Sequence, residues 1–495
     1  MNPLSQATLP SPSDSATKPL LGPSIAATSL LCIVLLLNFL FLEGDSAYEV
    51  ANLAAISIGL AIAAGLIFEG KRGLKNLFRI DLLCIVGLYG LTLAEFLFEQ
   101  PSLNHYLNSD QVKKGLQLIF LGFGSLAIGR HLVRSHISAE SVNLSLPTIS
   151  PPLLTFFTIC AFLVGHLFMF IAVNFNPFEL FENLIGPRFA SPWGRGRYGN
   201  FSTLLNEFNL IVYIIPPIAG YALVNRKNFS KIQLLTILLS LLFILFVSFA
   251  RVTRNVLAIH LATFSIGFIF SQKQLKIIPL ALLSVTILAS FLFSSYHMLE
   301  FRNMGLKRYL EGGYYSSEST RDTLFIDFNL LPISQLAERF PGEYRYLGWE
   351  VPYWALIKPI PRAFWPDKPK GLSIGIEQAL GQDQATVAVT FIGESFMAAG
   401  KAGIIMAGLF FGALCSWWNR IAASGGGSLS IILYAVGFYG GMISMRSLFW
   451  LTTAALPAIA LLIFAKFFVP RFFPSLAGNQ TPNLPNKNAS NLSRA

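Results

Sequence analysis

The sequence predicts an all-α polytopic membrane protein with about twelve transmembrane helices and one large external loop domain. Of its 495 residues, 54% are hydrophobic and 12% are charged, whereas soluble domains average about 25% charged residues. The charges are also unevenly placed, because 22 of the 61 Asp, Glu, Lys and Arg residues lie between positions 295 and 397. The chain therefore divides into long apolar stretches and one polar domain.

Twelve apolar runs are long enough to cross a bilayer, whose hydrocarbon core takes about 20 residues of helix. Helices satisfy their own backbone hydrogen bonds in lipid, so each run predicts a helix. The runs lie at 22–42, 49–69, 80–98, 115–133, 152–174, 202–224, 232–250, 254–271, 275–294, 398–417, 428–446 and 448–468.

These runs give a division into five parts. Helices one to nine occupy 22–294, the external loop domain with short amphipathic helices occupies 295–397, and helices ten to twelve occupy 398–468. The polar segments 1–21 and 469–495 are predicted to be disordered cytoplasmic ends. No cleavable signal pattern precedes the first run.

Positive charge in the short loops predicts the orientation. With the N-terminus in the cytoplasm, every second loop is basic, whereas the first external loop, EGDSAYE, is acidic. Both termini are then cytoplasmic and the loop domain is external. The basic residues of the cytoplasmic loops and tail are Lys71, Arg72, Lys75, Arg79, Arg130, Arg134, Arg226, Lys227, Lys231, Lys273, Lys276, Arg420, Lys466 and Arg471.

Several cations on the predicted external side run against this bias. Arg251 and Arg254 lie in a hairpin, ARVTRN, that has almost no loop, whereas long loops such as 295–397 escape the bias altogether. Guanidinium groups bind phosphate in a planar, bidentate geometry. Converging arginines at a membrane surface suit a lipid-linked pyrophosphate. The other cations assigned to this role are Arg195, Arg197, Arg321, Arg362 and Lys368.

The segment Lys358–Gly371, KPIPRAFWPDKPKG, contains four prolines and cannot form a helix interior. It predicts a stiff loop that holds Arg362 and Lys368 over the mouth of the helix bundle. Trp365 and Tyr353, in and near this loop, offer aromatic faces for sugar rings, although Trp and Tyr are also enriched at membrane interfaces.

Glu394 is the strongest candidate for a general base that deprotonates an acceptor hydroxyl. It lies in TFIGESFMAAGKAG, at the mouth of the tenth run, and glycines flank it. An ion pair with a nearby arginine would explain it equally well. The alternative bases are Asp327, Asp367 and His297.

Other chemistries lack support in the sequence. The four cysteines are far apart in apolar runs, and the six histidines show no metal-ligand spacing, so we expect neither a metal site nor a cofactor. Phosphate-binding glycine motifs are absent. The net charge of +11 fits membrane loops and pyrophosphate, and nucleic acid is not an expected partner.

The order of three motifs resembles the bacterial O-antigen polymerases, or oligosaccharide repeat-unit polymerases. The motifs are the hairpin SFARVTRNVLAI, the loop IPRAFWPDKP and the segment TFIGESFMAAGKAG. Asn255 stands where the family usually has glycine, and Phe396 where tyrosine is common. The residues that match the family pattern are Arg254, Pro361, Arg362, Trp365, Pro366, Lys368, Pro369, Gly393, Glu394, Gly400 and Gly403.

The resemblance implies a metal-independent membrane glycosyltransferase in the bacterial plasma (inner) membrane. Its donor and acceptor would be polyprenyl-diphosphate-linked oligosaccharides, and its product an O-antigen or exopolysaccharide chain. Chain-length regulators and flippases would be its protein partners. Glu394, Arg254 and Arg362 would be catalytic.

Two other functions stay open. An O-antigen ligase usually carries a histidine in its large external loop, and here only His297, at the loop's edge, could serve. A lipid-glycan flippase or transporter would carry charges deep in several spans.

Overall fold

The computed structural model describes residues 22–133, 149–193, 205–302, 304–312, 329–362, 364–381, 387–423, 427–468 and 471. Within these ranges the chain is helical and forms no β-strand, which confirms the all-α class. The longer helices are α1 (Ile25–Phe41), α2 (Ala47–Lys71), α3 (Ile80–Thr92), α5 (Ser109–Gly129), α6 (Pro151–Ala172), α9 (Ile215–Val224), α10 (Lys231–Ala250), α11 (Arg254–Ser271), α12 (Ile277–Glu300), α17 (Thr390–Ala423), α18 (Ser428–Arg446) and α19 (Leu451–Ile463).

Shorter helices join these elements or cover one end of them. The α-helical ones are α4 (Leu103–Tyr106), α7 (Pro177–Ile185), α13 (Leu306–Leu310), α14 (Leu330–Arg339), α15 (Glu350–Ile357) and α16 (Ile376–Ala379). The others are η1 (Leu74–Phe78), η2 (Ala94–Leu97), η3 (Arg188–Ala190), η4 (Phe208–Ile214), η5 (Arg226–Asn228), η6 (Leu448–Trp450) and η7 (Phe464–Phe468).

Nine helical segments of the described chain are long and apolar enough to cross a membrane, as a polytopic membrane protein requires. Three further apolar helical segments, Ile25–Phe41, Ile80–Thr92 and Leu448–Ile463, are shorter. The twelve runs predicted from the sequence fall on these nine long and three short segments. Their hydropathy is a local property, which is why the sequence locates them well.

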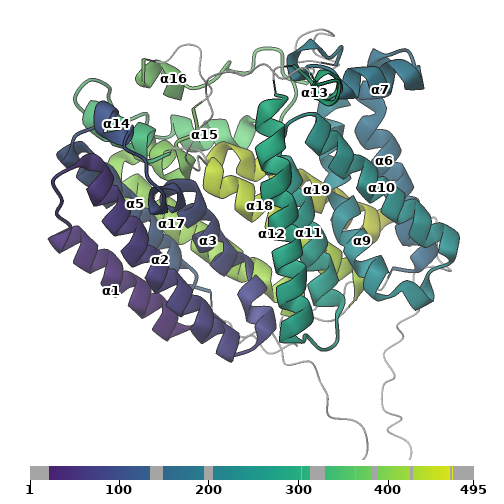
Figure 1. The fold of residues 1–495 in the computed structure, drawn as a ribbon, viewed down its shortest axis with the longest axis horizontal. Coiled ribbons are helices and arrows are strands. Elements are labelled where there is room, and N and C mark those ends of the chain that lie inside the picture. The colour runs from purple at the N-terminus through teal and green to yellow at the C-terminus, as the bar shows by residue number, and fades with distance from the viewer. Residues whose placement is uncertain are drawn as a thin grey trace, which may run out of the picture.

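Two groups of helices pack on either side of α18 (Figure 1). In one group, α1, α2, α3 and α17 surround α5. In the other, α6, α9, α10 and α11 pack together, and α12 adds to α10 and α11. Because α18 contacts α3, α9, α11, α17 and α19, it is the central helix. The short helices α7 and α13 to α16 lie along the upper edge in Figure 1, and we call this the loop-domain side.

Close helix packing depends on small residues at the crossings, as it does in membrane proteins generally. A Cβ atom added to Gly129 of α5 would lie 2.5 Å from the carbonyl oxygen of Leu409 on α17. At Gly267 of α11 it would lie 2.5 Å from the carbonyl oxygen of Pro217 on α9. Each group of helices therefore contains a crossing at which only glycine fits.

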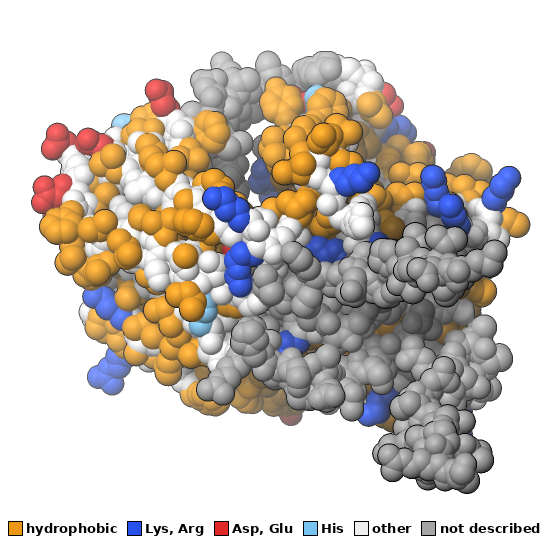
Figure 2. Space-filling view, turned by 90° about the horizontal axis from the view of Figure 1, so that it is seen from below, with side chains coloured by type: hydrophobic (Ala, Val, Ile, Leu, Met, Phe, Trp, Pro, Cys, Tyr) orange, Lys and Arg blue, Asp and Glu red, His pale blue; other side chains and the backbone are white. Residues whose placement is uncertain are grey.

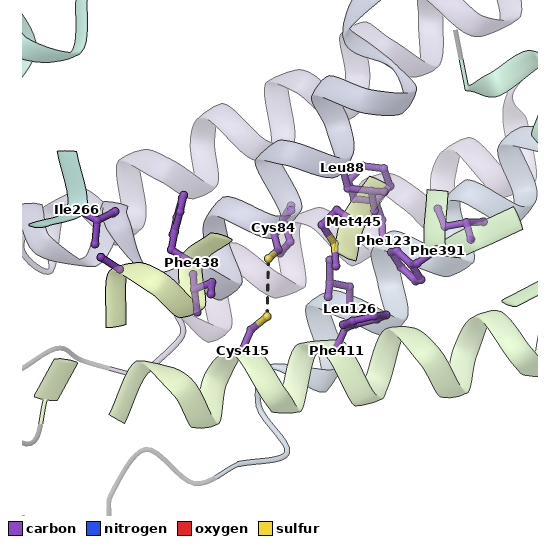
Figure 3. Close-up of a cluster of buried hydrophobic side chains, with 14 of the residues drawn as sticks. Cys84, Leu88, Phe123, Leu126, Ile266, Phe391, Phe411, Cys415, Phe438 and Met445 are labelled. Carbon is purple, nitrogen blue, oxygen red and sulfur yellow. Dashed lines mark hydrogen bonds between the residues drawn. The ribbon is translucent and has the colours of Figure 1, made fainter. Parts of the chain in front are cut away.

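A cluster of buried apolar side chains lies where α3, α5, α17 and α18 meet (Figure 3), and it belongs to a larger core that also includes residues of α2, α9 and α11. The thiols of Cys84 and Cys415 face each other across this core, with their sulfur atoms 3.7 Å apart. Both cysteines are free. They pack as small buried side chains, as expected from the apolar runs that contain them.

A buried ionic network ties α2, α3, α5 and α17 together near the ends that lie away from the loop domain. Arg79 donates to Asp81 at 2.7 Å, and both side chains are 1% exposed. Arg130, at the end of α5, lies 3.7 Å from Glu69 and 3.8 Å from Asp81. Asn419 of α17 donates to Asp81 at 2.6 Å. Arg79 and Arg130 were predicted only as basic loop residues that set the orientation, and their buried partners depend on the tertiary structure.

The face opposite the loop domain carries many cations (Figure 2). Figure 2 shows lysine and arginine side chains across this face, with acidic side chains largely at its margins. Exposed cations occur in the turns that join α2 to α3, α9 to α10 and α11 to α12, for example Lys71, Lys227 and Lys273. This distribution agrees with the charge asymmetry predicted from the short loops.

Helices overlap both borders of the predicted loop domain, 295–397. Helix α12 runs on to Glu300 and α17 already begins at Thr390. The predicted disordered ends, 1–21 and almost all of 469–495, lie outside the described residues.

Candidate functional site

Helix α17, which carries Glu394, is interrupted little more than one turn after this residue. Within α17, Ala399 and Gly400 leave the helical conformation, and Gly400 has φ +61°, a value that favours glycine. The break frees the carbonyl groups of Met397 and Ala398, which accept hydrogen bonds from the backbone N–H groups of Leu347 and Gly348 at 2.9 and 2.8 Å. The break thus docks the loop domain onto α17 and sets the direction of the segment that carries Glu394.

Glu394 is 2% exposed and is held by the junction of α18 and η6. The Ser447 hydroxyl donates to one carboxylate oxygen at 2.5 Å, and the Leu448 backbone N–H donates to the other at 2.5 Å. Glu394 therefore caps the start of η6, where a helix leaves N–H groups without intrahelical partners. This fixes the carboxylate firmly and gives it a structural role in addition to any chemical one.

Lys358 is the cation beside Glu394. It is close enough to act on the charge of the carboxylate, and its Nζ lies 4.2 Å from the centre of the Trp450 ring and 5.7 Å from that of Phe449. An ammonium group over aromatic faces is stabilised by their quadrupoles. Lys358 and Glu394 form, together with Ser447 and Trp450, what we call the carboxylate centre.

The two central cations of the proline-rich loop, Arg362 and Lys368, donate hydrogen bonds to the backbone of the loop itself. Arg362 donates to the carbonyl oxygens of Lys368 and Pro369 at 2.6 and 2.8 Å. Lys368 is 8% exposed and donates to the carbonyl oxygens of Lys358 and Ile360, both at 2.8 Å. Prolines remove backbone donors, so the loop has more acceptors than donors, and these two side chains supply the missing N–H groups.

These bonds correct the expectation that Arg362 and Lys368 project over the mouth of the bundle. In the structure they shape the loop, and the loop in turn places Lys358 at the carboxylate centre. Burial, with a smaller contribution from Arg362, lowers the pKa of Lys368, while Glu207 acts in the opposite direction. Lys368 also lies 5.3 Å from the ring centre of Trp354.

The two aromatic candidates lie near this loop but differ in exposure. Tyr353 on α15 is 40% exposed and accessible to a ligand. Trp365 is partly buried. Asp367, an alternative base, is exposed in the loop. Of the two aromatic residues, Tyr353 is the more accessible to a sugar.

Arg254 begins α11, which packs against α18. The ring of Tyr213 on η4 stacks on the ring of Tyr439 on α18, with their centres 4.0 Å apart. The centre of the Tyr213 ring also lies 4.9 Å from that of His260 on α11. Ile443, one turn before Ser447, packs against the same cluster. The first turns of α11 and the carboxylate centre thus both border the loop-domain end of α18.

Arg251 belongs to a second group of cations, although it is only three residues from Arg254. Its guanidinium lies 5.4 Å from the ring centre of Trp193, and Arg188 is its charged neighbour. Arg302, directly after α12, acts on Arg188. We call Arg188, Arg251, Arg302 and Trp193 the arginine centre. Arg251 was predicted to hold pyrophosphate together with Arg254, Arg362 and Lys368, and its neighbours in the described chain include Trp193 and Arg188.

His297, predicted as an alternative base, has two polar partners in the structure. Its Nδ1 lies 2.8 Å from the Tyr309 hydroxyl and 3.2 Å from a Glu300 carboxylate oxygen. The Glu300 spacing of three residues on one helix was a usable signal, but the contact with Tyr309 depends on the turn after α12.

Four candidates lie outside the described residues: Arg195, Arg197, Arg321 and the alternative base Asp327. In the part of the chain that is described, no group of three or more His, Cys, Asp or Glu side chains could hold a metal ion.

Comparisons with known proteins give no relative from which a function could be transferred. No protein-family model, curated protein or solved structure matches the chain. Its function must therefore be argued from its own residues.

Proposed function

We propose that the protein is a membrane glycosyltransferase that polymerises polyprenyl-diphosphate-linked oligosaccharide repeat units into a surface polysaccharide. One observation carries the proposal. Two of the three motifs that resemble repeat-unit polymerases, the loop at 358–371 and the segment around Glu394, converge on the junction of α18 and η6. The third motif begins α11, which packs on α18.

In the proposed reaction, Glu394 takes the proton of the acceptor hydroxyl. The hydroxyl oxygen then bonds to the anomeric carbon of the donor, and the bond from that carbon to the phosphate oxygen breaks. The polyprenyl pyrophosphate leaves with the bonding electrons. Lys358 and Arg254 stabilise the charge that develops on it, as preorganised cations do in other transferases. Arg362 and Lys368 act as positioning residues through the loop.

The proposal includes a topology. We propose that all twelve apolar segments cross the bacterial inner membrane, that both termini are cytoplasmic and that the loop domain is external. Lipid-linked donor and acceptor would then reach the carboxylate centre from the outer leaflet. The cation-rich face in Figure 2 would be cytoplasmic, in agreement with the positive-inside rule.

The test is deletion of the gene in the native host, followed by size separation of the surface glycans and complementation with variants. Wild type should restore a ladder of repeat units. Arg254→Ala and Glu394→Gln should leave single repeat units at normal protein levels. Glu394→Gln removes the general base, which typically contributes about 10²- to 10⁴-fold to the rate. Arg254→Ala removes a cation that stabilises the leaving pyrophosphate. Arg226→Gln, an exposed arginine in the turn between α9 and α10, is the matched control. A full ladder from both site variants would contradict the proposal.

A ligase is the second candidate, and the His297 contacts favour it. A histidine held by a carboxylate and a phenol has one ring nitrogen fixed and the other available for proton transfer. In the deletion strain, a ligase would leave an intact polymer ladder on its lipid carrier, and His297→Gln would reproduce that result while Glu394→Gln would not.

A flippase is the third candidate, and the buried network of Glu69, Asp81 and Arg130 is the observation that favours it. Ionisable groups inside a membrane protein often mark a transport path. The network, however, lies at helix ends and pairs its charges with one another. Accumulation of repeat units on the cytoplasmic side of the deletion strain would identify a flippase.

A further inference from the structure

Helix α12 lies at the surface of the bundle beside α11 (Figure 1). No residue at positions 281–294 of α12 is buried, whereas α11 buries residues along most of its length, from Leu257 to Phe270. The segment Ile277–Met298 is one of those long and apolar enough to cross a membrane. In the proposed topology, most of the surface of α12 therefore meets lipid.

A groove of about 280 Å³ separates the middle parts of α11 and α12. One wall is formed by positions 258–269 of α11 and the other by positions 283–291 of α12. Toward the loop-domain side the two helices meet again, because Leu257 belongs to one buried cluster with Met298 and Phe301. The groove is thus a feature of the helix pair itself.

Small side chains on α11 create this space. Ala258, Ala262 and Ser265 lie three or four positions apart, so they share the face of α11 that forms the wall. Small residues usually let two membrane helices approach closely, as Gly267 does where α11 crosses α9. Along the groove α12 does not come closer, and the volume that larger side chains would fill stays open.

The lining suits hydrocarbon. None of the described lining residues is charged, and the polar ones are the serines Ser265 and Ser284. The Ser265 hydroxyl already donates to the carbonyl oxygen of Leu261 at 2.7 Å. A charged ligand would lose its hydration in the groove without gaining partners, whereas a hydrocarbon chain has no polar group to satisfy.

The dimensions of the groove fit a single chain. Positions 258–269 extend about 16 Å along the axis of α11, which is about half the hydrocarbon thickness of a bilayer. A cavity of about 150 Å³ takes one benzene molecule. The groove, at about 280 Å³, therefore takes a chain segment of about ten carbon atoms, or about two isoprene units. A phospholipid would leave its second chain outside.

A cation lies in register with the groove at its loop-domain end. Arg254 is the first residue of α11 and precedes Ala258 by four positions, so it lies on the same face of the helix, one turn earlier. Side chains on a helix point toward its N-terminus, which directs the Arg254 side chain toward the loop-domain side. At the opposite end, the groove is lined by the apolar ring of Phe78 on η1.

We propose that the groove between α11 and α12 holds the polyprenyl chain of the lipid-linked donor, with its diphosphate at Arg254. This site rests on the proposed function, which requires a polyprenyl diphosphate. The lining selects hydrocarbon, the width selects one chain, and a guanidinium group suits the phosphate. Because α12 is exposed along the groove, the chain can enter sideways from the bilayer without crossing the bundle.

The test is photo-cross-linking of the purified full-length protein in phosphatidylcholine nanodiscs. The probe is a polyprenyl diphosphate with a diazirine in its chain, and the comparison probe is phosphatidylglycerol with the same diazirine in one acyl chain. Peptide mass spectrometry locates the labelled residues. We expect the polyprenyl probe to label positions 258–269 and 283–291, and excess undecaprenyl diphosphate to remove this labelling. Phosphatidylglycerol should label these positions at least about tenfold less, a difference of about 1.4 kcal/mol in binding free energy.

Variants then separate the chain from the headgroup. Ala262→Phe, which fills the groove, should lower the labelling at least about tenfold. Ala289→Phe is the matched control, because Ala289 is exposed on α12 outside the lining, and it should label as wild type does. Arg254→Gln should weaken labelling by the diphosphate but not by the corresponding uncharged alcohol. Lys75→Gln, on the short helix that carries Phe78, should change neither.

Equal labelling of the groove by both probes would show a general lipid surface and would overturn the proposal. A wild-type groove without labels, or a greater loss from Lys75→Gln than from Arg254→Gln, would do the same. The wild-type result needs no variant to fold and no glycosyl transfer to occur. An unlabelled groove in a protein whose deletion abolishes the ladder would remove this site alone, whereas a labelled groove with an intact ladder in the deletion strain would remove the polymerase proposal.

Discussion

Several charged residues of this protein stabilise the backbone through hydrogen bonds, a role that their charge alone does not suggest. Arg362 and Lys368 look like ligand cations in the sequence, yet each donates to two backbone carbonyl groups of its own loop. Glu394 looks like a base, yet it caps η6. The chemistry of the carboxylate centre therefore depends on residues that first hold the backbone in place.

For the loop, we predict that Arg362→Ala leaves the Lys368 and Pro369 carbonyl groups without their donor. Amide hydrogen exchange in 358–371 should rise, while the melting temperature of the whole protein should change little, because the loop lies outside the helix bundle. Lys370→Ala, on an exposed lysine of the same loop, is the control and should leave exchange unchanged. Unchanged exchange in Arg362→Ala would show that the prolines alone fix the loop.

For the buried network, we predict that Asp81→Asn is strongly destabilising. It leaves Arg79 and Arg130 buried without their shared carboxylate, and breaking a buried ion pair from one side costs about 3–5 kcal/mol. Thermal unfolding of the detergent-solubilised protein measures this loss.

Glu338→Gln serves as the control for Asp81→Asn. It breaks the pair between Glu338 and Lys114, whose side chains are 34% and 56% exposed, and such exposed pairs contribute about 0–1 kcal/mol. Equal melting temperatures for the two variants would mean that water reaches the network.

At the scale of elements, helix crossings at glycine decide how closely α5 and α17 approach. We predict that Gly129→Ala lowers the melting temperature and slows the assembly of the folded protein, because its Cβ would lie 2.5 Å from the Leu409 carbonyl oxygen. Gly124→Ala on the same helix is a matched control, since its Cβ would lie 3.9 Å from Leu35. If both variants melt alike, the α5–α17 crossing has room to adjust.

At the scale of the whole molecule, the charge distribution predicts the orientation. Green fluorescent protein fused to the C-terminus should fluoresce, because it matures in the cytoplasm. Alkaline phosphatase inserted after Gly371 should be active, because the loop domain would be external. An inactive phosphatase at this position would show that the loop domain is cytoplasmic. The carboxylate centre would then not face the outer leaflet.

The sequence by itself determined the helical class and the position of the apolar helices. Hydropathy and the need to satisfy the backbone in lipid act on consecutive residues, so the runs at 49–69 and 232–250 match α2 and α10 within a few residues. Turn composition also located the proline-rich loop, because proline excludes a helix wherever it stands.

Only the tertiary structure decided which side chains meet. Glu394 bonds a residue 54 positions away, Asn419 reaches Asp81 across 338 positions, and Cys84 faces Cys415 across 331. Arg251 and Arg254 are neighbours in the chain but border different centres, because one lies in the turn and the other begins α11. Such contacts depend on how helices pack, and packing is a property of the whole chain that no local pattern contains.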